Sequence, residues 1–234
     1  MHYFPLATPA LLGLLILLVL VAGAIASQLL RFASTSMGLA PQTMLAVLVL
    51  CLLGSYINIP IAYWPDRQAA TAAEVSYFGI RYVIPVVREW QGTVLAVNVG
   101  GAVIPTLLSL YLIVKNRLCG LAVAGILPVA IACYLLAKPE PGLGIAEPIF
   151  VPALVTALVA ITLSRRYAGA LAYICGSLGT LLGADVMNLP KIRGLGAPVA
   201  SIGGAGTFDG IFLIGLLAVL YAGWFSPATR ARHA

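Results

Sequence analysis

The run from Leu11 to Leu30 contains no charged side chain, and several apolar runs of similar length follow it along the chain. A membrane-spanning helix needs about 20 consecutive apolar residues. Soluble domains carry charges on about a quarter of their residues, whereas only 9% of this chain is charged and 62% is hydrophobic. The sequence therefore predicts a polytopic membrane protein.

Proline, glycine and charged residues divide the chain into about seven apolar segments. We predict an all-α transmembrane helix bundle, with broken helices near the third and seventh spans. The whole chain, residues 1–234, forms a single integral membrane domain, and residues 61–90 form a surface loop. The predicted helices cover about 8–30, 41–60, 91–114, 118–137, 148–164, 167–189 and 207–225.

The distribution of basic residues predicts the orientation in a cell (inner) membrane. No Lys or Arg precedes the first apolar run, and Arg31 follows it, which is typical of a retained helix whose N-terminus lies outside. One side of the bundle then carries basic residues and no acid, which places the C-terminus in the cytoplasm. These residues are Arg31, Lys115, Arg117, Arg165, Arg166, Arg230 and Arg232.

Charge and cysteine usage limit the expected partners. The net charge of +6 comes from Lys and Arg residues at the helix ends, where they anchor spans. The lipid bilayer is the expected partner, with a membrane-spanning peptide or a small solute as the other candidates, and we expect no nucleic acid. The four cysteines form no CxxC pair and both histidines are terminal, so we expect no metal site and no cofactor.

The loop over residues 61–90 is rich in aromatic residues and has two interpretations. Its tyrosines and tryptophans are typical of an aromatic belt at the membrane surface. The stretch "VSYFGIRYVIPVV" is also rich in strand-forming residues, which favours a short hairpin that covers a site.

Polar residues inside the spans gather at one end of the predicted bundle. Helix alternation places five of them at the same membrane level, and we assign the amides among them, with nearby small residues, to substrate or ion binding. The five are Asn58, Asn98, Asp185, Asn188 and Asp209. The small residues assigned with them are Gly203, Gly204 and Thr207, which precede Asp209 and let the chain enter the membrane in a non-helical conformation.

Asp185 and Asp209 are the predicted catalytic residues. Each lies near the loop that joins consecutive antiparallel spans, so their carboxyl groups are expected to face one another and share a proton. Two structural alternatives stay open. Asp209 or Thr207 caps its own helix, or Asp185 pairs with Lys191 or Arg193 at the interface.

An internal repeat is a further prediction. The segments "NVGGAVIP" (Asn98–Pro105) and "SIGGAGTF" (Ser201–Phe208) share Gly-Gly-Ala, and each opens an odd-numbered span from the same side. "INIP" and "MNLP" end the spans that precede them. The offset of four spans predicts a parallel three-plus-one-plus-three arrangement, which sugar carriers also use.

Two resemblances follow from these motifs. "LGTLLGADVMNLPKI" and "GAPVASIGGAGTFDGIF", with "NVGGAVIP" as a third motif, resemble a prokaryotic multi-pass membrane family known as domain of unknown function 1614. This resemblance implies that Asp185 and Asp209 belong to the family's signature stretches, and it supplies no activity. "LGADVMNLPKI" also resembles the Gly-x-Gly-Asp segment of prepilin and preflagellin peptidases, with Ala184 in place of the second glycine.

The sequence leaves three functions open. The Asp pair favours an intramembrane aspartyl protease-like hydrolase, in which one carboxyl activates water and the other protonates the carbonyl. The broken helices and the repeat favour a small-solute transporter coupled to protons or another cation. A non-catalytic membrane subunit remains if both acids are caps or interface partners.

Overall fold

A computed structural model describes residues 8–64, 71–77, 80–86, 92–140, 144–192, 199–204 and 210–225. Its elements in the first half of the chain are α1 (Thr8–Met37), α2 (Pro41–Gly54), β1 (Asn58–Trp64), β2 (Thr71–Tyr77), β3 (Ile80–Val86), β4 (Thr93–Asn98), the π-helix η1 (Val99–Val103) and α3 (Ile104–Asn116). The second half contains α4 (Cys119–Leu136), β5 (Lys138–Glu140), β6 (Gly144–Ala146), α5 (Phe150–Leu163), α6 (Ala168–Thr180), the π-helix η2 (Leu181–Val186), α7 (Leu189–Ile192), β7 (Val199–Ile202) and α8 (Gly210–Phe225).

The predicted transmembrane helix bundle is confirmed. Four helical stretches are long and apolar enough to cross a membrane, namely Leu11–Met37, Val99–Asn116, Cys119–Leu136 and Ala168–Lys191. Three shorter apolar helices, α2, α5 and α8, complete the bundle. Large hydrophobic side chains are exposed on most of its outer helices, as expected where lipid covers the surface. The chain is therefore a membrane protein with a helical bundle.

Helix α6 forms the centre of the bundle. It packs against α8, α4, α5, α3 and α1, and every one of its residues except Leu178 is buried. Small residues make this packing possible, because a Cβ at Gly176 would lie 3.0 Å from the Cα of Gly215 in α8. Membrane helices commonly use such small residues to bring their backbones close together.

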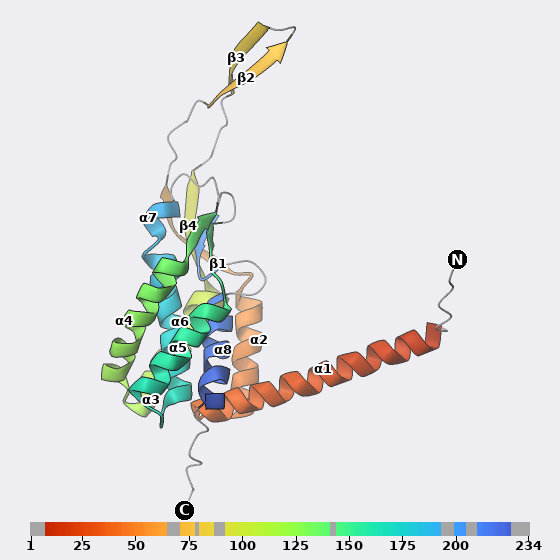
Figure 1. Cartoon of the computed structure of the whole chain (residues 1–234), viewed down its shortest axis with the longest axis vertical. Helices are drawn as coiled ribbons and strands as arrows, with labels where there is room; N and C mark the ends of the chain where they lie inside the picture. The colour runs from red at the N-terminus through yellow and green to blue at the C-terminus, as the bar shows by residue number, and fades with distance from the viewer. Residues whose placement is uncertain are drawn as a thin grey trace, which may run out of the picture.

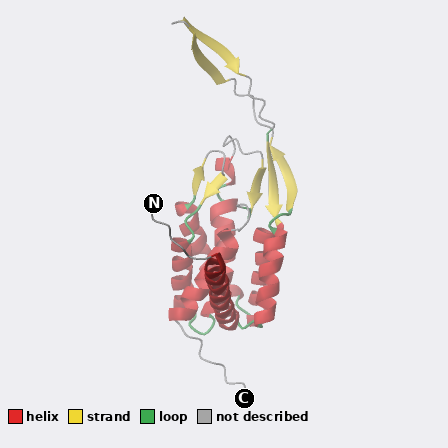
Figure 2. Cartoon of the chain, turned by 90° about the vertical axis from the view of Figure 1, so that its right-hand side faces the viewer, coloured by secondary structure: helices red, strands yellow, loops and turns green. Residues whose placement is uncertain are grey.

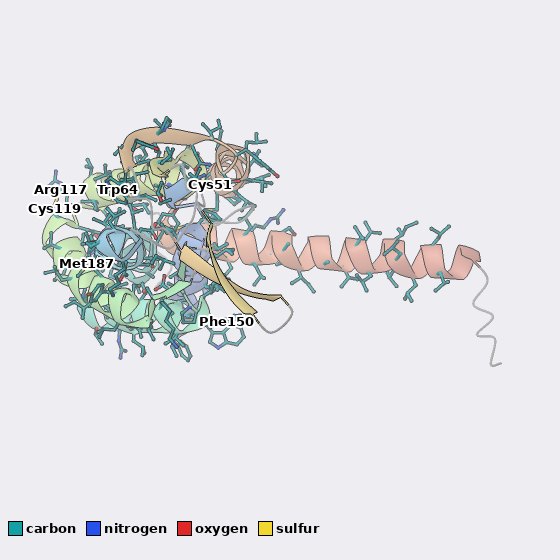
Figure 3. The ribbon with its side chains drawn as sticks, turned by 90° about the horizontal axis from the view of Figure 1, so that it is seen from above. Cys51, Trp64, Arg117, Cys119, Phe150 and Met187 are labelled. Atoms are coloured by element: carbon teal, nitrogen blue, oxygen red, sulfur yellow. The ribbon has the colours of Figure 1, made fainter. Side chains whose placement is uncertain are left out.

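Helix α1 behaves differently from the rest. Its described residues from Leu11 to Leu29 are exposed, and only its C-terminal end packs on the bundle, where Ala33, Ser34 and Met37 are buried. Figures 1 and 3 show α1 leaving the bundle sideways. Figure 3 also places Phe150 and Cys119 on the rim of the bundle, and both residues are exposed.

Strands lie at one end of the bundle, where the sequence analysis expected helix ends and a loop. A three-stranded sheet has the order β1-β4-β7, in which β1 and β4 are antiparallel and β4 and β7 are parallel. Two hairpins, β2–β3 and β5–β6, accompany it. Figure 2 shows these strands gathered above the same end of the helices. The helix expected over 41–60 therefore ends at Gly54, and the one expected from 91 begins at Val99.

The β2–β3 hairpin answers the question about the loop over 61–90. Its register runs from Thr71↔Val86 to Tyr77↔Ile80, so the hairpin interpretation is confirmed for the backbone of these strands. Figure 1 shows the hairpin standing beyond the three-stranded sheet, away from the helices. The described strands of this hairpin therefore do not cover the polar residues of the bundle.

Candidate functional site

Two segments with the same local pattern meet at the sheet end of the bundle. In each, a strand leads into a glycine pair and then toward a helix: β4, Gly100–Gly101 and α3 in the first, and β7, Gly203–Gly204 and α8 in the second. The two strands lie side by side and parallel, with Val97 opposite Ile202. Residues 205–209, which include Thr207 and Asp209, lie outside the described residues.

Two asparagines, Asn58 at the start of β1 and Asn98 at the end of β4, form the first polar cluster of the site. Asn98 Nδ2 donates to Ser55 O at 2.7 Å and to Asn58 Oδ1 at 3.0 Å. Asn98 Oδ1 accepts a bond of 2.8 Å from the Gly101 amide and so caps η1. Because every polar atom of this buried amide is bonded to protein, Asn98 is held as a structural link between β4, η1 and the end of α2.

We call Ser201–Gly204 the glycine turn, since β7 ends here in a tight reversal. Gly204 N donates to Ser201 O at 3.2 Å, and Gly203 has a φ of +74°, a conformation that residues with a Cβ rarely adopt. A Cβ at Gly203 would lie 2.6 Å from the Ala102 amide nitrogen. The turn therefore packs directly on the start of η1.

The glycine turn connects the asparagines with Asp185. Ser201 Oγ donates a bond of 2.6 Å to Asn58 Oδ1. Two residues later, the Gly203 amide donates a bond of 2.6 Å to Asp185 Oδ2 in η2. Asn58, Asn98 and Asp185 thus lie at the same end of the bundle and around one turn, as the sequence analysis predicted.

Asp185 is held by a backbone amide, and Lys191 has a different partner. The Lys191 ammonium lies 4.2 Å from the centroid of the Tyr134 ring. Through this cation–π contact, Lys191, which the sequence suggested as an ion-pair partner for Asp185, interacts with Tyr134 instead. Arg193, the other cation offered, and Asp209, the predicted second carboxyl, lie outside the described residues.

A second carboxyl that the sequence analysis did not select lies near Asp185. Glu147, just before α5, contacts the thiol of Cys133 on α4 and feels the charge of Asp185. Burial raises the pKa of the Glu147 carboxyl to about 7, the Cys133 contact lowers it, and the Asp185 charge raises it further. Glu147 Oε1 is buried without a hydrogen-bond partner among the described residues.

Cys133, the residue that contacts Glu147, lies where α4 packs closely on α6 and η2. Cys133 Sγ lies 3.5 Å from Thr180 Oγ1 at the end of α6. Gly183 brings η2 close to α4, because a Cβ there would meet the backbone of Ala130. The sequence did contain one indication that Glu147 belongs to this site, because helix counting places its loop at the same end of the bundle as Asp185.

Asn188, one turn after Asp185, is fully buried. Its Nδ2 donates to Gly183 O and Ala184 O, both at 3.0 Å, and so holds the end of η2. Its Oδ1 has no hydrogen-bond partner among the described residues. Within the same part of the chain, no group of three or more His, Cys, Asp or Glu residues is arranged to hold a metal ion.

Comparison with known families adds one result. The family model described as a protein of unknown function (DUF1614) matches residues 52–221. The chain belongs to the DUF1614 family. The match includes the asparagines, Glu147, Asp185 and the glycine turn, so the whole candidate site lies inside the DUF1614 region. No curated protein and no solved structure matches the chain, and the resemblance to prepilin peptidases is not supported by these comparisons.

Chemically, the site combines two carboxyl groups with broken backbone segments. Burial, with a smaller effect of the nearby Asp185, raises the pKa of Glu147 to about 7, so this carboxyl takes up and releases a proton near neutral pH. η1 and the glycine turn each place a backbone amide at this end of the bundle, where Asn98 and Asp185 accept their hydrogen bonds. This arrangement is suited to binding and releasing a proton or another small charged species.

Proposed function

We propose that this DUF1614 protein is a proton-coupled transporter of a small solute. The proposal is carried by the two strand–glycine–helix segments that lie side by side, the second of which contacts Asp185 through Gly203. Secondary transporters bind their substrates where membrane segments of two related units are interrupted. Non-helical backbone at membrane depth is tolerated where it is buried in protein or lines a watery cavity.

The similar course of the two segments supports this proposal. β4 and β7 are parallel, and each leads through a glycine pair toward a helix, α3 or α8. The spatial register pairs Val97 with Ile202, which is shifted by two residues from the alignment of the two Gly-Gly-Ala motifs. In the proposed three-plus-one-plus-three arrangement, α4 joins two units that run in the same direction through the membrane.

The proton would be bound by Glu147 and Asp185. The pKa of Glu147, raised to about 7 by burial, lets this carboxyl exchange a proton in the physiological range. Asp185 accepts a hydrogen bond from the Gly203 amide, which fixes its carboxyl group beside the glycine turn. The proposed orientation has the sheet end outside and the basic end, with Lys115 and Arg117, in the cytoplasm of a cell membrane.

Proteoliposomes that contain a pH-sensitive dye test the proposal. Gradients of amino acids, sugars and carboxylates are imposed one class at a time, and internal pH is followed. We expect one class to drive proton movement, and Asp185→Asn to abolish it. Cys119→Ser is the matched control, because this exposed thiol lies 14 residues before Cys133, about 21 Å away along α4. Full coupling in Asp185→Asn, or no proton movement with any class, contradicts the proposal.

An intramembrane hydrolase is the second candidate. It is favoured by the carboxyl pair, since a buried pair that shares one proton can activate water and protonate a carbonyl. Asp185 would act with Asp209, as the sequence suggested, or with Glu147. Cleavage of single-span peptides by the purified protein, lost in Asp185→Asn, would support hydrolysis. If both this variant and Asp209→Asn keep all function, the protein acts as a non-catalytic subunit.

A further inference from the structure

Two hydrogen bonds to side chains of other elements hold the glycine turn, and their acceptors differ in charge. At its start, the neutral Ser201 hydroxyl donates to the neutral amide of Asn58. At Gly203, the backbone amide donates to a carboxylate, Asp185. A hydrogen bond to an ionised acceptor is about twice as strong as one between neutral groups. The strength of the Gly203–Asp185 bond therefore depends on the charge of Asp185, whereas that of the Ser201–Asn58 bond does not.

The packing of the turn on η1 leaves its backbone little freedom to move while these hydrogen bonds are intact. Gly203 packs on the backbone of Gly101 and Ala102 at the start of η1, and Gly204 lies against Ser201 and Asn98. Within the turn itself, one backbone bond, from Gly204 to Ser201, closes the reversal. The start of the turn, Ser201 and Ile202, is also paired with β4 in the sheet, so the Gly203 end is the part held by the bond to Asp185 and by close packing on η1.

The titratable groups near Asp185 are few. On the elements packed against η2, they are Cys119, Cys133 and Tyr134 of α4 and Tyr173 and Cys175 of α6, while β7 has none among its described residues. Lys191 follows η2 in the chain. Cys133 and Glu147 interact electrostatically with Asp185, and Lys191 lies over Tyr134. Neutralisation of Asp185 is thus not compensated by a cation among these groups.

We infer that the glycine turn is a proton-responsive latch: it stays seated on η1 while Asp185 is ionised, and it is released when Asp185 takes up a proton. Release separates the Gly203 amide from the Asp185 carboxyl. This latch rests on the proposed function only for its role in transport, because the seating of the turn is a property of the protein without solute.

Hydrogen–deuterium exchange of the full-length protein in lipid nanodiscs tests the latch without any solute. Exchange of the peptide that contains residues 199–204 is measured at pH 8 and pH 5 and corrected for the intrinsic pH dependence of amide exchange. We expect its protection to fall about tenfold at pH 5, the difference between a hydrogen bond to a charged and to a neutral acceptor. Equal protection at the two pH values overturns the inference.

Three variants assign the response to Asp185. Asp185→Asn should show the low protection at both pH values, because its side chain is always neutral. Ser201→Ala should lower protection while keeping the pH dependence. Glu147→Gln should keep the wild-type response. If the response vanishes in Glu147→Gln and persists in Asp185→Asn, Glu147 controls the turn and the inference is wrong.

The wild-type and Glu147→Gln comparisons still decide the question if Asp185→Asn does not fold, as size-exclusion chromatography would reveal. The outcome is also separable from transport. A latch that responds to pH in a protein that moves no solute would leave the inference intact and contradict the transporter. Transport without a pH response in the turn would support the transporter and contradict the latch.

Discussion

Asp185 and Gly203 lie 18 residues apart in the chain, and the carboxylate of Asp185 accepts a 2.6 Å hydrogen bond from the Gly203 amide. This bond ties the end of the sixth span to the entrance of the seventh. It also explains the small residues between Ser201 and Gly204. A left-handed glycine, packed on the backbone of η1, brings the amide within reach of the acid.

Glu147→Gln should change how stability depends on pH. The pKa of Glu147 rises from its ordinary value of 4.5 to about 7 in the folded protein, so the folded state holds a proton that the unfolded state releases. This stabilisation is fully present below pH 4.5 and is lost as the pH rises through about 7. Thermal unfolding in detergent should therefore show wild-type stability falling across this range, and a flatter profile for Glu147→Gln. An unchanged slope in the variant would contradict the assignment.

Gly100→Ala should destabilise the junction between α2 and η1. The new Cβ would meet the backbone of Cys51 and Ser55, and such overpacking costs about 1–3 kcal/mol. Gly23→Ala is the matched control, since a Cβ at Gly23 has nothing within 4 Å and alanine favours the helix. Melting temperatures measured by tryptophan fluorescence should fall only for Gly100→Ala. Equal melting temperatures would count against the close approach.

Asn98→Ala should also lower stability, by about 1–3 kcal/mol, because buried partners at Ser55 and Gly101 lose their bonds. The control is Asn116→Ala, whose side chain makes one bond of 3.0 Å, to Leu112 O. We expect this control to stay within about 0.5 kcal/mol of wild type. Chemical unfolding in mixed micelles measures both changes, and a silent Asn98→Ala would show that the asparagine link is dispensable.

Leu171→Ala and Leu17→Ala should separate the core from the lipid-facing surface. Leu171 on α6 is fully buried, whereas Leu17 on α1 is 57% exposed. Truncating a buried leucine costs about 2–5 kcal/mol, while Leu17 loses only contacts with lipid. The expected result is a large loss of thermal stability for Leu171→Ala alone. Similar losses in the two variants would mean that α1 packs along its length on something else.

The spans were predictable wherever one continuous apolar run has polar residues at both ends. α4 was expected over 118–137 and is observed at Cys119–Leu136, because "KNR" and "KPEP" mark its ends. The strands within apolar runs were not predictable in the same way. β4 and the third span read as one apolar segment, and hydrophobicity alone does not distinguish a buried strand from a helix.

The candidate site was predictable in part. Asn58, Asn98 and Asp185 were placed at one end by counting helices, and hydrogen bonds through the glycine turn confirm this. Glu147 was missed because it lies in a loop rich in Pro and Gly, where an acid is usually solvated. Its burial against Cys133 depends on how α4 and α5 pack, and no local pattern in the sequence reports that packing.

The central position of α6 has a consequence for biogenesis. The ribosome delivers α1 to α5 before the residue stretch Ala168–Thr180, on which most of these helices pack, has been made. Until then, lipid or an insertion chaperone must occupy the space that α6 later fills. The order of synthesis therefore leaves the first five helices without their central packing partner during translation, and α8, which packs on both α6 and α5, completes the bundle last.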